Sequence, residues 1–114
     1  MKNYLANSIG HFDICGSDAP RLHDFYGGVF GWTLDLKGPG YALAKTPEGS
    51  PDGAILEAEQ ASLTIGIVVT DIENTISEAL RLGGNILMPL VDNGWVKKAV
   101  LTDPAGNKIT IIQS

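Results

Sequence analysis

Residues 9–32 read IGHFDICGSDAPRLHDFYGGVFGW, and within this stretch the apolar residues change from the period of a strand to that of a helix. In its first part, Phe12 and Ile14 fall on one face of an extended chain, and His11 and Asp13 fall on the other. Successive side chains of a strand point to opposite faces. We therefore expect the apolar pair to face a helix and the polar pair to face away from it.

A helix is predicted in the second part of this stretch. Asp18 suits the N-cap, Pro20 suits the first turn, and Gly31 suits the left-handed position after the last turn. His23 lies between Leu22 and Asp24 on the polar side of this helix, so we expect it on the surface. The apolar residues recur at helical spacing and are expected to face the sheet: Leu22, Phe25, Tyr26, Val29 and Phe30.

The same pattern returns later in the chain. Thr70-Asp71 opens a second helical stretch that closes at Gly83-Gly84, and Asp71 stands 53 residues after Asp18. This internal repeat predicts two modules, about residues 8–60 and 61–114, within a single domain of residues 1–114. The pairs at this spacing are Phe12 and Ile65, Ile14 and Ile67, Asp18 and Asp71, Gly31 and Gly84, Pro51 and Pro104, and Gly53 and Gly106.

Each module is predicted to hold a strand, a helix and three further strands. Thr70 and Glu73 have the spacing of a capping box at the start of the second helix, whose apolar stripe is Ile72, Ile76, Ala79 and Leu80. The predicted fold class is therefore α+β, with two tandem βαβββ modules. The later strands are expected at residues 32–36, 41–45 and 54–58 in the first module and at 85–90, 95–101 and 108–112 in the second.

Composition restricts the partners. The 114 residues include 8 Lys+Arg and 13 Asp+Glu, which gives a net charge of −5. Nucleic-acid binding depends on clustered basic residues, so this balance argues against a nucleic-acid partner and favours a cationic or neutral small molecule. No apolar run approaches the roughly 18–20 residues of a membrane span, and the first residues lack the pattern of a signal peptide. We expect a cytoplasmic protein with no membrane partner.

Three stretches together resemble the vicinal oxygen chelate superfamily: His11 to Ile14, Asp24 to Trp32, and Thr102 to Asn107. This superfamily includes lactoylglutathione lyase (glyoxalase), bleomycin-resistance proteins, fosfomycin-resistance proteins and extradiol dioxygenases. The resemblance covers nearly the whole chain. It implies that the curved sheets of the two modules enclose a cavity, whose metal is held by His or carboxylate groups from the first and last strands of each module.

The resemblance places the first metal ligand at His11. On the strand at 54–58, Ala54 and Leu56 are expected to face the helix, which directs Glu57 into the cavity. Adding the repeat spacing of 53 to His11 and Glu57 gives two threonines, Thr64 and Thr110, whose side chains are expected to point inward.

These residue types decide the expected function. A catalytic divalent metal needs three or four His, Cys or carboxylate ligands, and threonine hydroxyls are poor substitutes. His11 and Glu57 form half of a metal site, to which Asp13 offers a further oxygen. We therefore expect a small-molecule-binding protein of the glyoxalase/bleomycin-resistance type, with no complete metal site and no cofactor. Its ligand-binding residues are predicted to be His11, Asp13, Glu57, Thr64, Trp95 and Thr110.

Two alternatives stay open at the level of sequence. In the first, the chain is a metal-dependent lyase, isomerase or dioxygenase in which His11 and Glu57 bind a divalent cation that polarises vicinal substrate oxygens. In the second, it is a regulatory or structural dimer with a filled cavity. The resemblance implies a homodimer, and the cavity is built either within one chain or between two.

Overall fold

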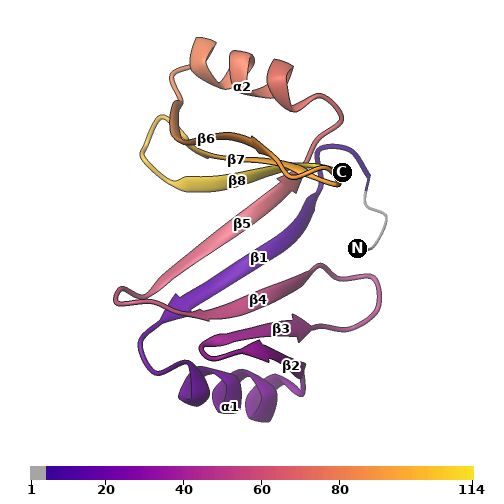
Figure 1. The fold of residues 1–114 in the computed structure, drawn as a ribbon, viewed down its shortest axis with the longest axis vertical. Helices are drawn as coiled ribbons and strands as arrows, with labels where there is room; N and C mark the ends of the chain where they lie inside the picture. The colour runs from indigo at the N-terminus through magenta and orange to yellow at the C-terminus, as the bar shows by residue number, and fades with distance from the viewer. Residues whose placement is uncertain (1–4) are drawn as a thin grey trace. The chain divides into compact units, whose positions relative to one another are not determined.

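The structure, a computed structural model, describes residues 5–114, which form eight strands and two helices (Figure 1). The chain divides into two compact units. The first unit is His11–Thr64, and the second is Ile65–Ser114 together with residues 5–10. A strand, a helix and three strands follow one another twice, which confirms the α+β class with two βαβββ modules. Neither helix in the described part of the chain is long and apolar enough to cross a membrane.

In the first unit, α1 packs on one face of a sheet in which β4 joins β1 in parallel and β3 antiparallel. The strands lie in the order β2-β3-β4-β1. Ile14, Ala44 and Ile55 are buried between helix and sheet. The elements are β1 (Ile9–Gly16), α1 (Ala19–Phe30), β2 (Thr33–Gly38), β3 (Tyr41–Lys45) and β4 (Asp52–Glu57).

The second unit repeats this arrangement, with strand order β5-β8-β7-β6 and a parallel β5–β8 pair. Its core is formed by Val69, Ile72, Ala99, Leu101 and Ile111. The elements are β5 (Ser62–Val68), α2 (Ile72–Arg81), β6 (Asn85–Asp92), β7 (Lys97–Thr102) and β8 (Lys108–Gln113).

The predicted ends of α1 are confirmed. The Oδ1 atom of Asp18 accepts a hydrogen bond from the Arg21 amide at 3.3 Å. At the other end, Gly31 has a φ of 72° and donates its amide to the Gly27 carbonyl at 3.0 Å. Glycine suits this left-handed position because it has no Cβ.

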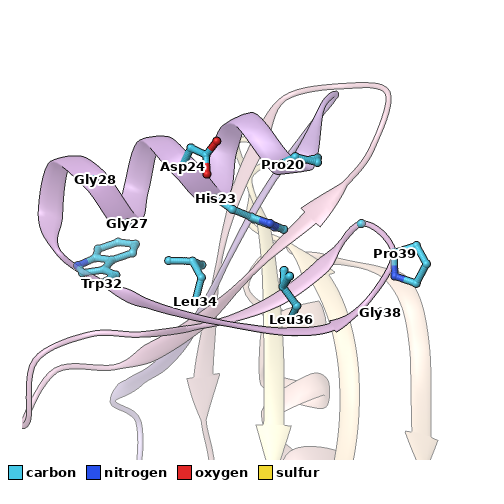
Figure 2. A pocket seen from close by; sticks show the side chains of 11 residues that line it. Pro20, His23, Asp24, Gly27, Gly28, Trp32, Leu34, Leu36, Gly38 and Pro39 are labelled. Atoms are coloured by element: carbon cyan, nitrogen blue, oxygen red, sulfur yellow. The ribbon is translucent and has the colours of Figure 1, made fainter.

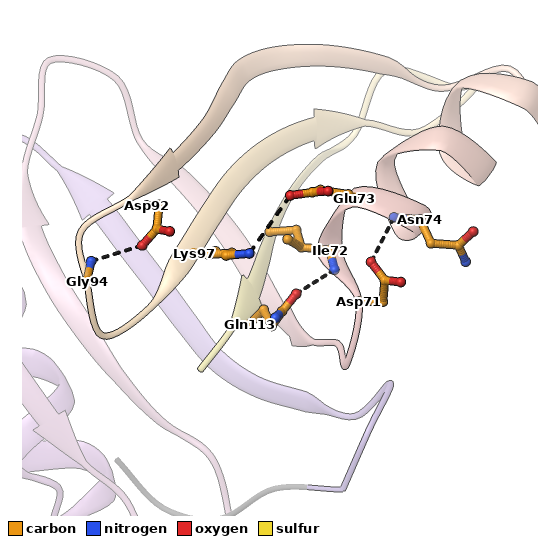
Figure 3. A network of polar contacts seen from close by, with 8 residues as sticks. All are labelled: Asp71, Ile72, Glu73, Asn74, Asp92, Gly94, Lys97 and Gln113. Carbon is orange, nitrogen blue, oxygen red and sulfur yellow. Dashed lines mark hydrogen bonds and ion pairs between the residues drawn. The ribbon is translucent and has the colours of Figure 1, made fainter.

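The capping box predicted for α2 is wrong. Asp71, rather than Thr70, caps the helix, and its Oδ1 accepts from the Asn74 amide at 3.1 Å (Figure 3). The helix begins one residue later than expected, so Glu73 is too close to the cap to reach back to it. The Glu73 carboxylate instead lies 3.8 Å from the ammonium group of Lys97 on β7.

The apolar stripe of α1 is narrower than predicted. Leu22 and Tyr26, four residues apart, pack against the core as expected. Phe25, Val29 and Phe30 are instead 54%, 59% and 57% exposed, because they lie on the flanks of this stripe. The rings of Phe25 and Phe30 contact that of Tyr26, with centroids 5.1 and 6.0 Å away, rather than the core of the sheet.

The repeat spacing changes between the helix and the last strand of each unit. Ile14 and Ile67, which are 53 residues apart, pair with Ile55 and Ile111, which are 56 apart. The matched glycines at 53 and 106 are therefore not equivalent in the structure. The first lies in β4 under the Phe12 ring, whereas the second lies in a turn at φ 98°.

Gly53 allows that ring to pack directly on the backbone of β4. A Cβ built on Gly53 would lie 2.4 Å from a ring carbon of Phe12, much closer than any real contact. Phe12 and Gly53 are partners in the β1–β4 register, so this close approach fixes the face on which both residues lie.

The turn before β8 is held by Asp103. Its Oδ1 accepts from the amides of Ala105 and Asn107, each at 2.9 Å, and its Oδ2 accepts from the Asn107 side chain. The side-chain hydrogen bond from Asn107, reinforced by its backbone amide, holds the pKa of the Asp103 carboxyl below its ordinary value. This turn lies within the stretch Thr102–Asn107, one of the three that carry the resemblance described above.

Asp103 should therefore contribute stability that depends on pH. A carboxyl whose folded pKa is depressed stabilises the fold above its unfolded pKa and loses this effect as pH falls through the folded pKa. We expect Asp103→Ala to lower the urea midpoint at about pH 7, and the gap to the unmodified protein to narrow at about pH 3. An equal gap at both values would contradict this account of the turn.

Two glycines, one within α1 and one directly after it, should respond in opposite ways to alanine. Gly28 lies within the helix, and a Cβ there would meet nothing within 4 Å. Gly28→Ala should stabilise the protein by about 0.5–1 kcal/mol, because alanine loses less backbone entropy. Gly31→Ala, the matched control at positive φ, should destabilise it by about 1–2 kcal/mol. Urea unfolding measures both, and a gain at Gly31 would contradict the assigned helix end.

Candidate functional site

His11 and Asp13 form a polar pair on the face of the first unit's sheet that points away from α1. Phe12, on the same strand, packs against the core under the helix, so alternation directs its two neighbours to the other face. The Nε2 atom of His11 lies 3.0 Å from Oδ1 of Asp13, and the two side chains are 31% and 28% exposed. The structure therefore brings these two predicted residues together.

The strands beside this pair present small and apolar side chains. Asp13 aligns with Ala54 on β4, which in turn aligns with Leu43 on β3. His11 aligns with Asp52, whose Oδ1 accepts from the Thr46 amide at 3.1 Å. The face therefore places the hydrogen-bonded polar pair beside two apolar side chains, Ala54 and Leu43, and one further carboxylate, Asp52.

Glu57 lies on the opposite, helix-facing side of the sheet. Its two carboxylate oxygens accept hydrogen bonds from the amides of Asp18 at 2.9 Å and Ala19 at 2.8 Å. These amides start α1 and have no partner within the helix, and a negative charge is favourable at this end. The carboxylate stabilises the start of α1.

The expectation that Ala54 and Leu56 face the helix is wrong, because Ile55 occupies that place in the core. Ile55 aligns with Ile14 of β1, and Glu57 follows two residues later on the same face. His11 and Glu57 consequently point to opposite faces, and the structure does not bring them together.

In the second unit, Gln113 is the counterpart of Glu57. Its Oε1 accepts from the Ile72 amide at the start of α2, at 2.7 Å (Figure 3). Glu57 and Gln113 are 56 residues apart, so the projection from Glu57 to Thr110 used the wrong spacing. The position that corresponds to Thr110 in the first unit is Ala54.

The remaining predicted residues occupy three different settings. Thr110 is buried, and it points away from α2 because its neighbour Ile111 faces the core. Thr64 lies on β5, three residues before Ile67. Because Ile67 packs against the core of the second unit, Thr64 points to the opposite face. Trp95 lies in the turn between β6 and β7 and is 80% exposed. A ligand-binding role stays a prediction for all three.

The side chains on this face of the first unit do not fit a catalytic metal. Among residues 5–114, no three His, Cys, Asp or Glu side chains are grouped so that they could hold an ion. His11 and Asp13 provide two groups that already bond to each other, and the Glu57 carboxylate is held by amides on the other face. Catalytic sites with zinc use three protein ligands and an open position.

A groove of about 590 Å³ lies on the helix side of the first unit, between α1 and β2. The expectation that His23 is a surface residue is wrong, because it lines this groove and its Nε2 atom is buried with no hydrogen-bond partner among the described residues (Figure 2). His23 stands three residues before Tyr26, which packs on the core. Residues three apart share a helix face, so this spacing was the available signal.

Two βαβββ modules, each with its helix packed on one face of its own four strands, define the class of this protein as α+β with paired modules. The sequence model of the Glyoxalase/Bleomycin resistance protein/Dioxygenase superfamily matches residues 8–111. The chain belongs to this superfamily, as the resemblance in the sequence indicated. No curated protein matches it by sequence.

Solved structures share the fold at low sequence identity. A glyoxalase/bleomycin resistance protein/dioxygenase superfamily member from Vibrio splendidus 12B01 is 16% identical, with a TM-score of 0.72 over 90% of this chain and 96% of that one. A variant of Streptomyces coelicolor methylmalonyl-CoA epimerase, in complex with 2-nitronate-propionyl-CoA, is 16% identical, with a TM-score of 0.69 over 97% and 99% of the two chains.

A third structure is much longer than this chain. The Mn(II)-bound glyoxalase from Novosphingobium aromaticivorans is 13% identical and has a TM-score of 0.73, with 95% of this chain aligned to 39% of that one. These likenesses show the fold.

The position of Glu57 predicts a structural role that can be measured. Glu57→Ala should destabilise the protein by about 1–2 kcal/mol, because two amides at the start of α1 lose their acceptor. Glu57→Gln is the matched control, since glutamine already serves at the equivalent position 113; it should retain part of this stability. Urea unfolding gives both values. If Glu57→Ala is as stable as the unmodified protein, the assigned role is wrong.

Proposed function

We propose that the chain binds a small molecule on the face of the first unit that carries His11 and Asp13, without a complete metal site. The observation that supports this most is the hydrogen-bonded pair itself, which is partly buried beside apolar side chains. Binding sites commonly combine apolar walls with a few placed polar groups. The family membership supports the same reading.

The pair determines which ligand groups would be recognised. A carboxylate only accepts hydrogen bonds, so the Nε2–H group of His11 donates the hydrogen bond to Asp13. In neutral histidine this leaves Nδ1 as an acceptor. Both residues then favour a ligand with hydrogen-bond donors, and the net charge of −5 favours a cationic one.

The apolar side of the ligand would lie against Leu43 and Ala54, which neighbour Asp13 across β4 and β3. We infer that the ligand is an organic amine with an apolar portion, rather than a small ion. Thr64, Trp95 and Thr110 remain contributors predicted from the sequence.

A metal-dependent lyase, isomerase or dioxygenase is the alternative. The fold shared with a Mn(II)-bound glyoxalase is the observation that favours it. For this chain, the alternative needs further ligands beyond His11 and Asp13, since Glu57 is held on the opposite face.

A screen of organic amines by thermal unfolding tests the proposal. A ligand at 100 times its Kd stabilises the native state by about 2.7 kcal/mol, which raises the melting temperature. We expect His11→Ala and Asp13→Ala to weaken binding about tenfold or more, because each removes a hydrogen-bonding group from the ligand. His23→Ala replaces the other histidine of the chain, on the opposite side of the sheet, and should leave this binding unchanged.

Metal analysis of the purified protein separates the two functions. Under the proposal, the protein purified without chelator holds no stoichiometric divalent metal, and added manganese, nickel, zinc or iron does not bind in a manner that depends on His11. Near-stoichiometric metal that is lost in His11→Ala would overturn the proposal in favour of the metal-dependent alternative.

We also propose a homodimer located in the cytoplasm, as the sequence led us to expect. Two-fold assemblies are the commonest oligomers, and dimers are implied by the family resemblance. Light scattering of the purified protein would test the dimer, and a monomeric mass across the accessible concentration range would contradict it.

A further inference from the structure

The groove between α1 and β2 has the composition of a binding site, although the function proposed above does not use it. Its volume is about 590 Å³, within the range typical of small-molecule sites. Figure 2 shows the His23 ring, Leu34 and Leu36 pointing into the space between helix and strand, with Trp32 at one end. Gly27 and Gly28 present only backbone along the helix side, which leaves the groove wide there.

The groove is mostly apolar but also includes Asp24, and one polar atom in it lacks a partner. The Nε2 atom of His23 is buried and makes no hydrogen bond with any described residue. A buried polar group that leaves its partner in water and gains none is unfavourable. Native structures seldom leave such a group unpaired. The Nε2 atom is therefore a point at which a bound molecule would form a hydrogen bond.

The walls of the groove differ in how firmly they are held. The Trp32 ring is stacked on Tyr26 with centroids 5.5 Å apart and contacts Phe12 at the same distance, so it forms a fixed wall. Leu36, by contrast, is 67% exposed and can change rotamer without loss of core packing. Because Nε2 of His23 has almost no exposed surface, a ligand reaches it when the Leu36 side chain turns aside, while Trp32 keeps its place (Figure 2).

These observations identify a class of ligand. A planar apolar molecule matches the leucine and tryptophan walls. A hydroxyl group both donates and accepts, so it pairs with Nε2 of His23 in either tautomer of the ring. We propose that this groove is a second binding site, which takes a small aromatic alcohol whose hydroxyl group bonds to His23.

The site is independent of the one proposed above, because it lies on the helix side of the sheet whereas His11 and Asp13 lie on the other face. The two sites also favour different ligands. The first takes an amine, and the second takes a neutral aromatic alcohol.

The test uses 2-naphthol as the probe, with 2-methylnaphthalene as a probe of the same shape that cannot form the hydrogen bond. Binding is followed by nuclear magnetic resonance through the indole N–H signal of Trp32, which is distinguished from that of Trp95 by the spectrum of Trp95→Phe. We expect 2-naphthol to shift the Trp32 signal and to bind about tenfold more tightly than 2-methylnaphthalene, which is the effect of one hydrogen bond.

The matched variant is His23→Phe, which keeps an aromatic ring but has no Nε2. It should bind both probes equally, so that the preference for 2-naphthol falls from about tenfold to about one. This ratio is informative even if the variant is less stable, because both probes are measured on the same folded protein. His11→Ala should keep the full preference, as it alters only the opposite face.

Three outcomes would overturn the second site. The first is no binding of 2-naphthol at the Trp32 signal. The second is an undiminished preference for 2-naphthol in His23→Phe. The third is loss of the preference in His11→Ala, which would assign the probe to the first site. None of these outcomes bears on whether amines bind beside His11 and Asp13, so failure here leaves the proposed function to its own test.

Discussion

The first amides of each helix are bonded by a side chain from the end of the last strand in the same unit. Glu57 accepts from the start of α1, and Gln113 accepts from the start of α2. These amides have no partner within the helix, so an acceptor must come from elsewhere. These hydrogen bonds connect each helix to the last strand of its unit, the one farthest from it along the chain. They require the bonding side chain of that strand to lie on the face that the helix covers.

That requirement determines what the other face can hold. Once Glu57 points toward α1, alternation places Ile55 in the core and Ala54 on the side of His11 and Asp13. A strand displaced by one residue would turn the carboxylate toward the polar pair and remove the acceptor from the helix. The stability of the start of α1 and the composition of the candidate site thus both depend on which residues of β4 face the helix.

The sequence predicted correctly which residues of β1 face the helix and incorrectly which residues of β4 do so. The difference has a clear physical reason. Phe12 and Ile14 alternate with His11 and Asp13, so only one face of β1 can be apolar. On β4 the residues Ala54, Ile55 and Leu56 are all apolar, and the local pattern holds no information about phase. The residues of β4 that face α1 are determined by its pairing with β1, where the Phe12 ring packs closely on Gly53. This contact joins strands far apart in the sequence, so the local pattern of β4 does not reveal it.

The fold could be predicted from the sequence because helix caps, glycines and periodic apolar residues are local signals. Asp18 and Gly31 mark the ends of α1 wherever the helix packs. The candidate site was only partly readable. His11 and Asp13 followed from alternation and resemblance, whereas the groove at His23 depends on how closely β2 approaches the helix, and its one sequence signal was the spacing to Tyr26.

The contact between Phe12 and Gly53 also distinguishes the packing of the two units. The same place in the second unit is occupied by the paired residues Ile65 and Ile109. One half fills the space with a large ring over a bare backbone, and the other fills it with two branched side chains of middle size. A large ring at position 12 requires a residue without a Cβ at position 53, so a substitution at either position alone would leave a void or a clash in the first unit.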